Sequence, residues 1–161
     1  MEEEIYYLRI DSPVGALKIT GTSSFINAVS FTDEAPEDFP QPPVLLLDCA
    51  QQLYEYFSGT RKTFELPLYQ EGTDFQQQVW KQLQEIPFGQ TISYQQLAKR
   101  VNNPKSVRAV GNTNGKNRLA IIVPCHRVIG SNGTLTGYAG GIWRKRWLIE
   151  HERADLFTGL M

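Results

Sequence analysis

The hydrophobic pattern changes its period along this chain, and that change limits the folds the chain can adopt. Residues 5–10, 14–20 and 25–31 are short runs rich in β-branched and aromatic residues, and turn-forming Ser-Pro and Gly-Thr-Ser-Ser sequences separate them. From Val44 onward, apolar residues instead recur at helical spacing. The pattern predicts an α+β fold, in which a small N-terminal antiparallel sheet with a helix precedes a mostly helical C-terminal part.

Cap and stop signals place the expected helices at about residues 44–58, 74–86, 93–101, 107–113 and 140–153. Gly59 ends the first helix, and Asp74, Ser93 and Ser106 are the expected N-caps of the next three. Gln96 lies three residues after Ser93, which is the spacing of a capping box. The helices that follow Ser93 and Ser106 are joined by a short turn, so together they form a helix-turn-helix pattern.

The charge is divided unevenly between the two parts of the chain. Residues 1–66 hold 4 Lys and Arg against 11 Asp and Glu, whereas residues 67–161 hold 12 against 6, which gives −7 and +6 and the total of −1. We therefore expect two domains, 1–66 and 67–161, of which the second faces a polyanion. A chance division of solvated surface charge is the alternative.

Composition excludes several classes of protein. The chain is 41% hydrophobic and 20% charged over 161 residues, so it can bury a core and is not of the disordered class. Its acidic first residues do not resemble a leader peptide, and no apolar run reaches membrane-spanning length, so we expect a cytoplasmic protein with no membrane partner. Two cysteines and two histidines provide neither a disulfide framework nor a metal site, and no metal is expected.

Cys125 is the candidate nucleophile. An apolar run at 121–123, expected to be strand-like and buried, leads into Pro124 and then the thiol, and the basic residues His126 and Arg127 follow. Cationic neighbours lower the pKa of a thiol and favour the reactive thiolate, which is the expectation here. In an extended backbone adjacent side chains point apart, so His126 would reach the thiol only through a turn or a water. Cys49 lies among apolar helix residues and is expected to be a buried hydrophobe.

A longer window around Cys125 carries a specific signature. It reads Pro124-Cys125-His126-Arg127-Val128-Ile129-Gly130 and continues with Gly137-Tyr138-Ala139-Gly140-Gly141. This combination resembles the O6-alkylguanine-DNA alkyltransferase family, whose active-site signature is that heptapeptide. The resemblance extends over about residues 73–152 and includes Ile92-Ser93-Tyr94-Gln95-Gln96-Leu97-Ala98 and Arg108-Ala109-Val110-Gly111.

The resemblance implies a set of catalytic residues. Cys125 accepts the alkyl group, His126 activates it through a water, and Glu152 orients His126. A carboxylate that fixes the imidazole tautomer and supports its charge suits this order. Tyr94 donates a hydrogen bond to the purine ring, and Asn117 braces the backbone around Cys125. A core aromatic and an ordinary turn residue are the alternative interpretations of Tyr94 and Asn117.

The resemblance also implies how substrate is held. The backbone N–H of Ala139 donates to O6, the carbonyls of Cys125 and Val128 accept from the exocyclic amine, and Tyr138 belongs to the same loop. Arg108 fills the place of the nucleotide that is flipped out of the duplex. Small residues expected to let the helix approach the DNA are Ala109, Gly111 and Thr113. Candidates for phosphate contacts are Lys99, Lys105, Lys116, Arg118 and Arg127.

Two positions depart from the family pattern. Many members have a hydroxyl residue where this chain has Ala139, so a side-chain hydrogen bond to O6 is lost while the backbone donor remains. The family's usual Asn-Pro is here Asn117-Arg118, which lets the following turn differ.

The implied activity is direct-reversal DNA repair by a monomer on double-stranded DNA, through the minor groove and largely independent of sequence. Each molecule acts once and needs no cofactor, and O4-alkylthymine stays open as a second substrate. Three alternatives remain: a silent lesion-binding relative, a hydrolase with a Cys-His-Glu site, and a helix-turn-helix regulator with an alkylation-sensing cysteine.

Overall fold

The computed structural model describes residues 3–160, and the side chains of residues 3–154. The chain divides into two compact units, one formed by residues up to Gln70 together with Arg118–Ile122, the other by residues 71–117 and from Val123 onward. The α+β class predicted from the sequence is confirmed, since a three-stranded antiparallel sheet occurs with helices in both units. Among the described residues, no helix is both long and apolar enough to cross a membrane.

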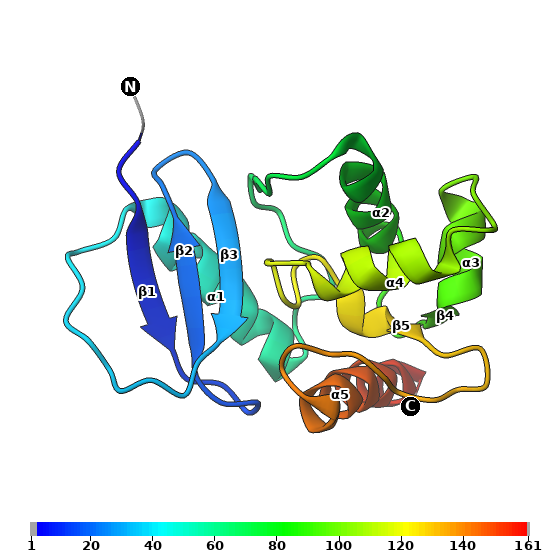
Figure 1. Ribbon diagram of the computed structural model, residues 1–161. Helices are drawn as coiled ribbons and strands as arrows, with labels where there is room; N and C mark the ends of the chain where they lie inside the picture. Colours follow the sequence, from blue (N-terminus) through cyan, green and yellow to red (C-terminus); the bar gives the residue numbers. More distant parts are fainter. Residues whose placement is uncertain (1–2, 161) are drawn as a thin grey trace. The chain divides into compact units, whose positions relative to one another are not determined.

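The first unit is a sheet covered by a helix (Figure 1). Strands β1 (Tyr6–Ile10), β2 (Leu17–Gly21) and β3 (Ile26–Phe31) pair antiparallel in that order, and helix α1 (Val44–Ser58) packs against them. Helix α1 has the predicted bounds and ends at Gly59, whose φ of 86° is left-handed.

Strand β2 begins later than the sequence predicted. The expected strand started at residue 14, but Gly15 has a φ of 100° and its N–H donates to Ser12 O at 3.0 Å. This tight turn delays the strand to Leu17, after which burial alternates along the strand as expected for one covered face.

The segment Arg118–Ile122 adds to the same unit beside β3. Val29 donates to Arg118 O at 2.9 Å, and Ala120 donates to Val29 O at 3.1 Å. The prediction that 121–123 is strand-like is wrong, because Ile122 N–H turns back to Ala120 O at 2.8 Å and Ile121 has a φ of 72°. A β-branched residue in the left-handed region is strained, so the surrounding packing must hold this turn.

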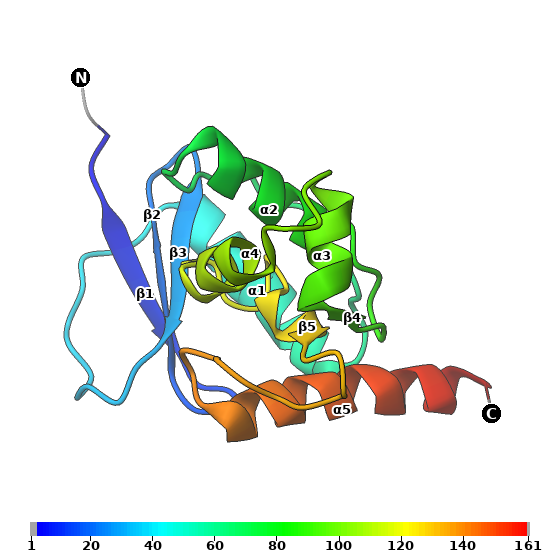
Figure 2. The same cartoon turned by 45° about the vertical axis from the view of Figure 1, so that its right-hand side comes forward.

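The second unit consists mainly of helices (Figure 2). Its elements are α2 (Asp74–Gln84), α3 (Tyr94–Arg100), α4 (Val107–Gly115) and α5 (Ile142–Leu160), the 3₁₀ helix η1 (Cys125–Arg127), and the short parallel strands β4 (Ile92–Ser93) and β5 (Val128–Ile129). Helix α3 packs on both α2 and α4, and α5 packs on η1. The two helices of the predicted helix-turn-helix pattern are thus present and adjacent.

The N-caps agree only in part with the sequence. Ser93 forms the predicted capping box, because its hydroxyl accepts from Gln96 N–H at 3.0 Å and Gln96 Oε1 accepts from Ser93 N–H at 2.8 Å. Asp74 is not a cap; Thr73 is, since its hydroxyl accepts from Gln76 N–H and leaves Asp74 inside the first turn. Ser106 occupies the N-cap position of α4, but its hydroxyl donates to Asn103 O at 2.6 Å and caps nothing.

Ser93→Ala should therefore lower the free energy of unfolding by about 1 kcal/mol, because an N-cap hydrogen bond is lost. Ser106→Ala, at the matching position of the next helix, should cost less. Urea unfolding followed by tryptophan fluorescence measures both. Equal losses in the two variants would show that the Ser93 cap contributes nothing specific.

Candidate active site

The segment around Cys125 is a tight turn rather than an extended strand. Cys125 N–H donates to Val123 O at 2.8 Å, and Arg127 N–H donates to Pro124 O at 3.0 Å, which starts η1 directly after the proline. In a 3₁₀ helix successive side chains point in different directions. Cys125, His126 and Arg127 therefore face different surroundings although they are consecutive.

Two asparagine side chains hold this segment. Asn117 Nδ2 donates to Val123 O at 2.8 Å, and Asn114 Nδ2 donates to Cys125 O at 3.2 Å. Asn117 therefore contacts the backbone next to Cys125, as the family resemblance implies. Asn114, in the last turn of α4, was missed, because the carbonyl that it binds lies 11 residues further along the chain.

The thiol of Cys125 is buried, with the residue 7% exposed. Burial raises the pKa of Cys125 above its ordinary value of 9.0, against the opposing effects of a hydrogen bond from Asn117 and the charge of Lys145. The expectation of a pKa lowered by basic neighbours is thus wrong, because burial of the sulfur outweighs the groups that act to lower its pKa. His126 and Arg127 contact Glu152 instead. Cys49 is fully buried with a pKa raised to about 12, which confirms its place as a buried hydrophobe.

His126 and Glu152 form a buried pair. His126 Nε2 lies 2.6 Å from Glu152 Oε2, and the two side chains are 0% and 2% exposed. Burial lowers the pKa of His126 below 6.5 even though Glu152 acts to raise it. Within residues 3–154, the other ring nitrogen, Nδ1, is buried and has no hydrogen-bond partner. The site therefore contains a neutral imidazole with one nitrogen oriented by a carboxylate.

Arg127 lies inside the protein and not at a phosphate-facing surface. It is 6% exposed, and its Nε and Nη2 lie 2.8 and 3.2 Å from the two carboxylate oxygens of Glu152. Burial alone would raise the pKa of Glu152, but its contacts with His126 and Arg127 outweigh the effect of burial and lower that pKa. The expectation that Arg127 contacts a phosphate is therefore wrong, because its guanidinium binds the carboxylate of Glu152.

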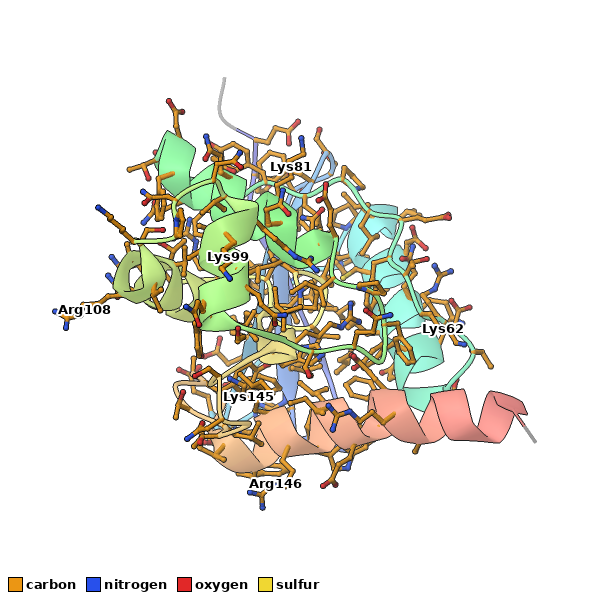
Figure 3. All side chains as sticks on the ribbon, turned by 90° about the vertical axis from the view of Figure 1, so that its right-hand side faces the viewer. Lys62, Lys81, Lys99, Arg108, Lys145 and Arg146 are labelled. Carbon is orange, nitrogen blue, oxygen red and sulfur yellow. The ribbon has the colours of Figure 1, made fainter. Side chains whose placement is uncertain are left out.

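Tyr94, at the start of α3, shares a carbonyl with Lys145. The phenol donates to Thr136 O at 3.4 Å, and Lys145 Nζ donates to the same oxygen at 2.8 Å and lies 3.5 Å from the phenol oxygen. Lys145 is completely buried, which lowers its pKa to about 8. Figure 3 shows Lys145 on the inner side of α5 and Arg146 on the outer side. Sequence reasoning missed Lys145, although it precedes Glu152 by seven residues and so occupies the same helix face.

The loop after β5 brings Tyr138 towards the thiol. Tyr138 is half-buried, and burial raises its pKa well above 10. Ala139 is exposed on this loop, and Val128 is fully buried in β5. Gly137 has a φ of 59°, which lets the loop turn beside Tyr138.

Helix α4 presents part of its expected surface. Arg108 and Ala109 are exposed, and Figure 3 shows Arg108 projecting away from the helix. At Gly111 an added Cβ would lie 3.6 Å from the Tyr94 ring. Thr113 differs from the expectation, because it is 4% exposed and its carbonyl accepts from Trp80 Nε1 at 3.1 Å. The other expected phosphate contacts that are exposed are Lys99, Lys105, Lys116 and Arg118.

Comparison with known proteins identifies this combination. Residues 74–154 match the family model described as 6-O-methylguanine DNA methyltransferase, DNA binding domain, and residues 5–70 match that of its ribonuclease-like domain. Proteins named methylated-DNA–protein-cysteine methyltransferase are similar: one from Methanosarcina acetivorans is 42% identical, covering 92% of this chain and 98% of its own, and a constitutive one from Bacillus subtilis is 45% identical, covering 92% and 95%.

Solved structures agree. The O6-methylguanine methyltransferase of Mycobacterium tuberculosis is 44% identical with a TM-score of 0.86 over 94% of both chains. The same organism's protein in complex with DNA is 45% identical with a TM-score of 0.85, over 92% of this chain and 93% of that one. A buried cysteine followed directly by a histidine that is paired with a buried glutamate, on this fold, defines the class of methylated-DNA–protein-cysteine methyltransferases. The chain belongs to the 6-O-methylguanine DNA methyltransferase family.

The buried His126–Glu152 pair should make the free energy of unfolding depend on pH in the acid range. Folding lowers the pKa of both His126 and Glu152, so in acid the unfolded chain binds more protons than the folded chain. The free energy of unfolding should fall as the pH drops below 6.5, the ordinary pKa of His126, and further below 4.5, that of Glu152, towards its lowered folded pKa.

Glu152→Gln should lower stability at neutral pH by about 3 kcal/mol, because it leaves Arg127 buried without a counter-charge. It should also flatten the acid dependence. Glu150→Gln, an exposed position on the same helix, is the matched control. Urea titrations at several pH values test this, and parallel curves for the two variants would contradict it.

Proposed function

We propose that this chain repairs alkylated DNA directly, by moving the alkyl group from O6 of guanine to the sulfur of Cys125. Family membership supports alkyl transfer to a cysteine, and the chain has only two cysteines. The observation that favours Cys125 is its place directly before His126 in η1, because the imidazole of His126 is paired with the buried carboxylate of Glu152. Cys49 lies instead in α1, where burial raises its pKa to about 12.

His126 is the base that receives the thiol proton. Its Nε2 faces Glu152, which leaves Nδ1 to accept. A bridging water carries the proton from sulfur to Nδ1, since buried waters bind at polar atoms that lack protein partners. The thiol stays protonated at rest, and the resulting imidazolium is stabilised by Glu152.

The alkyl transfer consists of three coupled changes in bonding. The sulfur forms a bond to the alkyl carbon, the carbon–O6 bond breaks, and its electron pair goes to the guanine ring. Tyr94 donates a hydrogen bond to the ring nitrogen where charge develops, and Lys145 beside the phenol favours that donation. A thioether gives up its alkyl group only to a strong nucleophile, so each molecule acts once and needs no cofactor.

The backbone of the reactive loop recognises the base. Ala139 N–H donates to O6, the carbonyls of Cys125 and Val128 accept from the exocyclic amine, and Tyr138 packs along the base. Asn114 and Asn117 keep the Cys125 segment in the required position through their hydrogen bonds to its carbonyls. These contacts would tell an alkylated guanine from other bases by its edge.

Double-stranded DNA binds through helix α4. Ala109 is exposed and Gly111 has no side chain, so α4 can approach the minor groove closely. Arg108 takes the place of the flipped nucleotide. The exposed lysines contact phosphates, so binding is largely independent of sequence. A monomer suffices. The acceptor and the residues proposed to bind DNA lie within 67–161, and residues 1–66 carry the excess of acidic side chains. Free cysteines and a DNA substrate support a cytoplasmic location.

Cys125→Ser should abolish transfer from a methylated duplex while lesion binding remains, because the hydroxyl is a far weaker nucleophile. Cys49→Ser should retain transfer. Intact-mass analysis after one incubation measures a single added methyl group, and peptide mapping locates it. A methyl group on Cys49, or repeated release of product, would assign the reaction elsewhere.

Arg108→Ala should slow repair of duplex lesions by about tenfold or more, because it leaves the unstacked state of the duplex unsupported. Its reaction with free alkylated guanine should be unchanged. Arg100→Ala removes an exposed arginine from α3 and serves as the control. Single-turnover rates of methyl transfer from the duplex and from free alkylated guanine test this prediction. An equal loss of rate on both substrates would show that Arg108 has no role in nucleotide flipping.

A further inference from the structure

Arg127 has no part in the reaction proposed above, yet it is buried against the catalytic pair. We infer that Arg127 is a positioning residue that keeps His126 a neutral base, by supplying the charge that balances Glu152. This inference rests on the proposed function, because it concerns the group that takes the thiol proton.

The contacts of Arg127 suit that role. Nε lies 2.8 Å from Glu152 Oε1 and Nη2 lies 3.2 Å from Oε2, a two-pronged arrangement that fixes the plane of the carboxylate. Nη1 donates to Ile86 O at 2.7 Å, so the guanidinium is also anchored to the backbone just after α2. Gly89 N–H donates to Glu152 Oε1 at 3.4 Å. Oε2 also lies against His126.

Charge balance explains why the pair needs this partner. A carboxylate beside an imidazole normally favours the imidazolium, and an imidazolium cannot accept a proton from sulfur. With Arg127 present, Glu152 already has its counter-charge, and the buried group of three is neutral while His126 is uncharged. Without it, Glu152 and neutral His126 would leave one unbalanced negative charge in a buried site, which binding a proton removes.

Other charged or titratable groups face the pair, and they do not replace Arg127. Lys145 on α5 acts in the same direction on His126, but its ammonium group is held by Thr136 O and the Tyr94 phenol. Tyr138 and the Cys125 thiol are uncharged when protonated. Arg127, in contrast, donates to both carboxylate oxygens of Glu152.

The test is the pH dependence of single-turnover methyl transfer from an oligonucleotide. Arg127→Gln should raise the pH at which His126 is protonated. Transfer at neutral pH should then fall by up to about tenfold for each pH unit that this midpoint rises above neutrality, and it should recover in alkali. Arg127→Lys keeps the charge and should keep the wild-type pH profile. Arg153→Gln removes an exposed positive charge next to Glu152 in the sequence and is the matched control.

A rate for Arg127→Gln that is reduced equally at every pH would overturn the inference, because loss of structure alone gives that result. If Arg127→Gln does not fold, the ring of His126 can be titrated by NMR in His151→Gln, which leaves one histidine in the chain. The inference expects an uncharged ring at neutral pH, and an imidazolium there would contradict it. Failure of the proposed function differs from both, since wild-type protein would then transfer no methyl group to Cys125.

Discussion

The site depends on the hydrogen bonds and ion pairs that the carboxylate of Glu152 makes. It comes from α5, and it is bound by His126 and Arg127 from η1 and by Gly89 from the loop after α2. A buried carboxylate is costly unless donors surround it, and here the donors come from segments that carry or support the site. The charge that orients the base therefore also joins three segments of the second unit.

The environment of Cys125 favours a thiol at rest over a permanent thiolate. Burial raises its pKa, and the nearest basic residues in sequence are turned to Glu152. Because an exposed thiolate would react with many electrophiles, a protonated and buried sulfur suits the single transfer proposed above. In that proposal the proton leaves only when His126 can receive it, so the protonation state of the imidazole decides whether transfer occurs.

Local signals explain what could be predicted from the sequence. Helix α1 was predicted with its observed bounds because Gly59 ends it, and the Ser93 capping box was predicted because its two partners are three residues apart. The order of residues in the segment predicted that His126 and Arg127 would act on the Cys125 thiol. In the structure, the 3₁₀ turn directs both side chains to Glu152 instead. That direction depends on Glu152, which is 25 residues further along the chain from Arg127, and no local pattern encodes it.

The remaining errors have the same origin. Ile121 was expected in a strand because its composition is apolar, but pairing of its segment with β3 holds it in a left-handed turn. Thr113 was placed with the small residues facing DNA, whereas helical phase puts it inside, near Trp80. Lys145 and Asn114 acquire their places through Thr136 and Cys125, contacts that exist only in the folded chain.

We propose that the sulfur of Cys125 is protonated at rest and gives up its proton only in the reaction. Ultraviolet titration of thiolate in the Cys49→Ser variant, in which Cys125 is the single thiol, measures its protonation state. No thiolate is expected at neutral pH, and the transition should lie above 9.0, the ordinary pKa of the thiol. A thiolate already formed at neutral pH would show that the sulfur is activated before substrate binds.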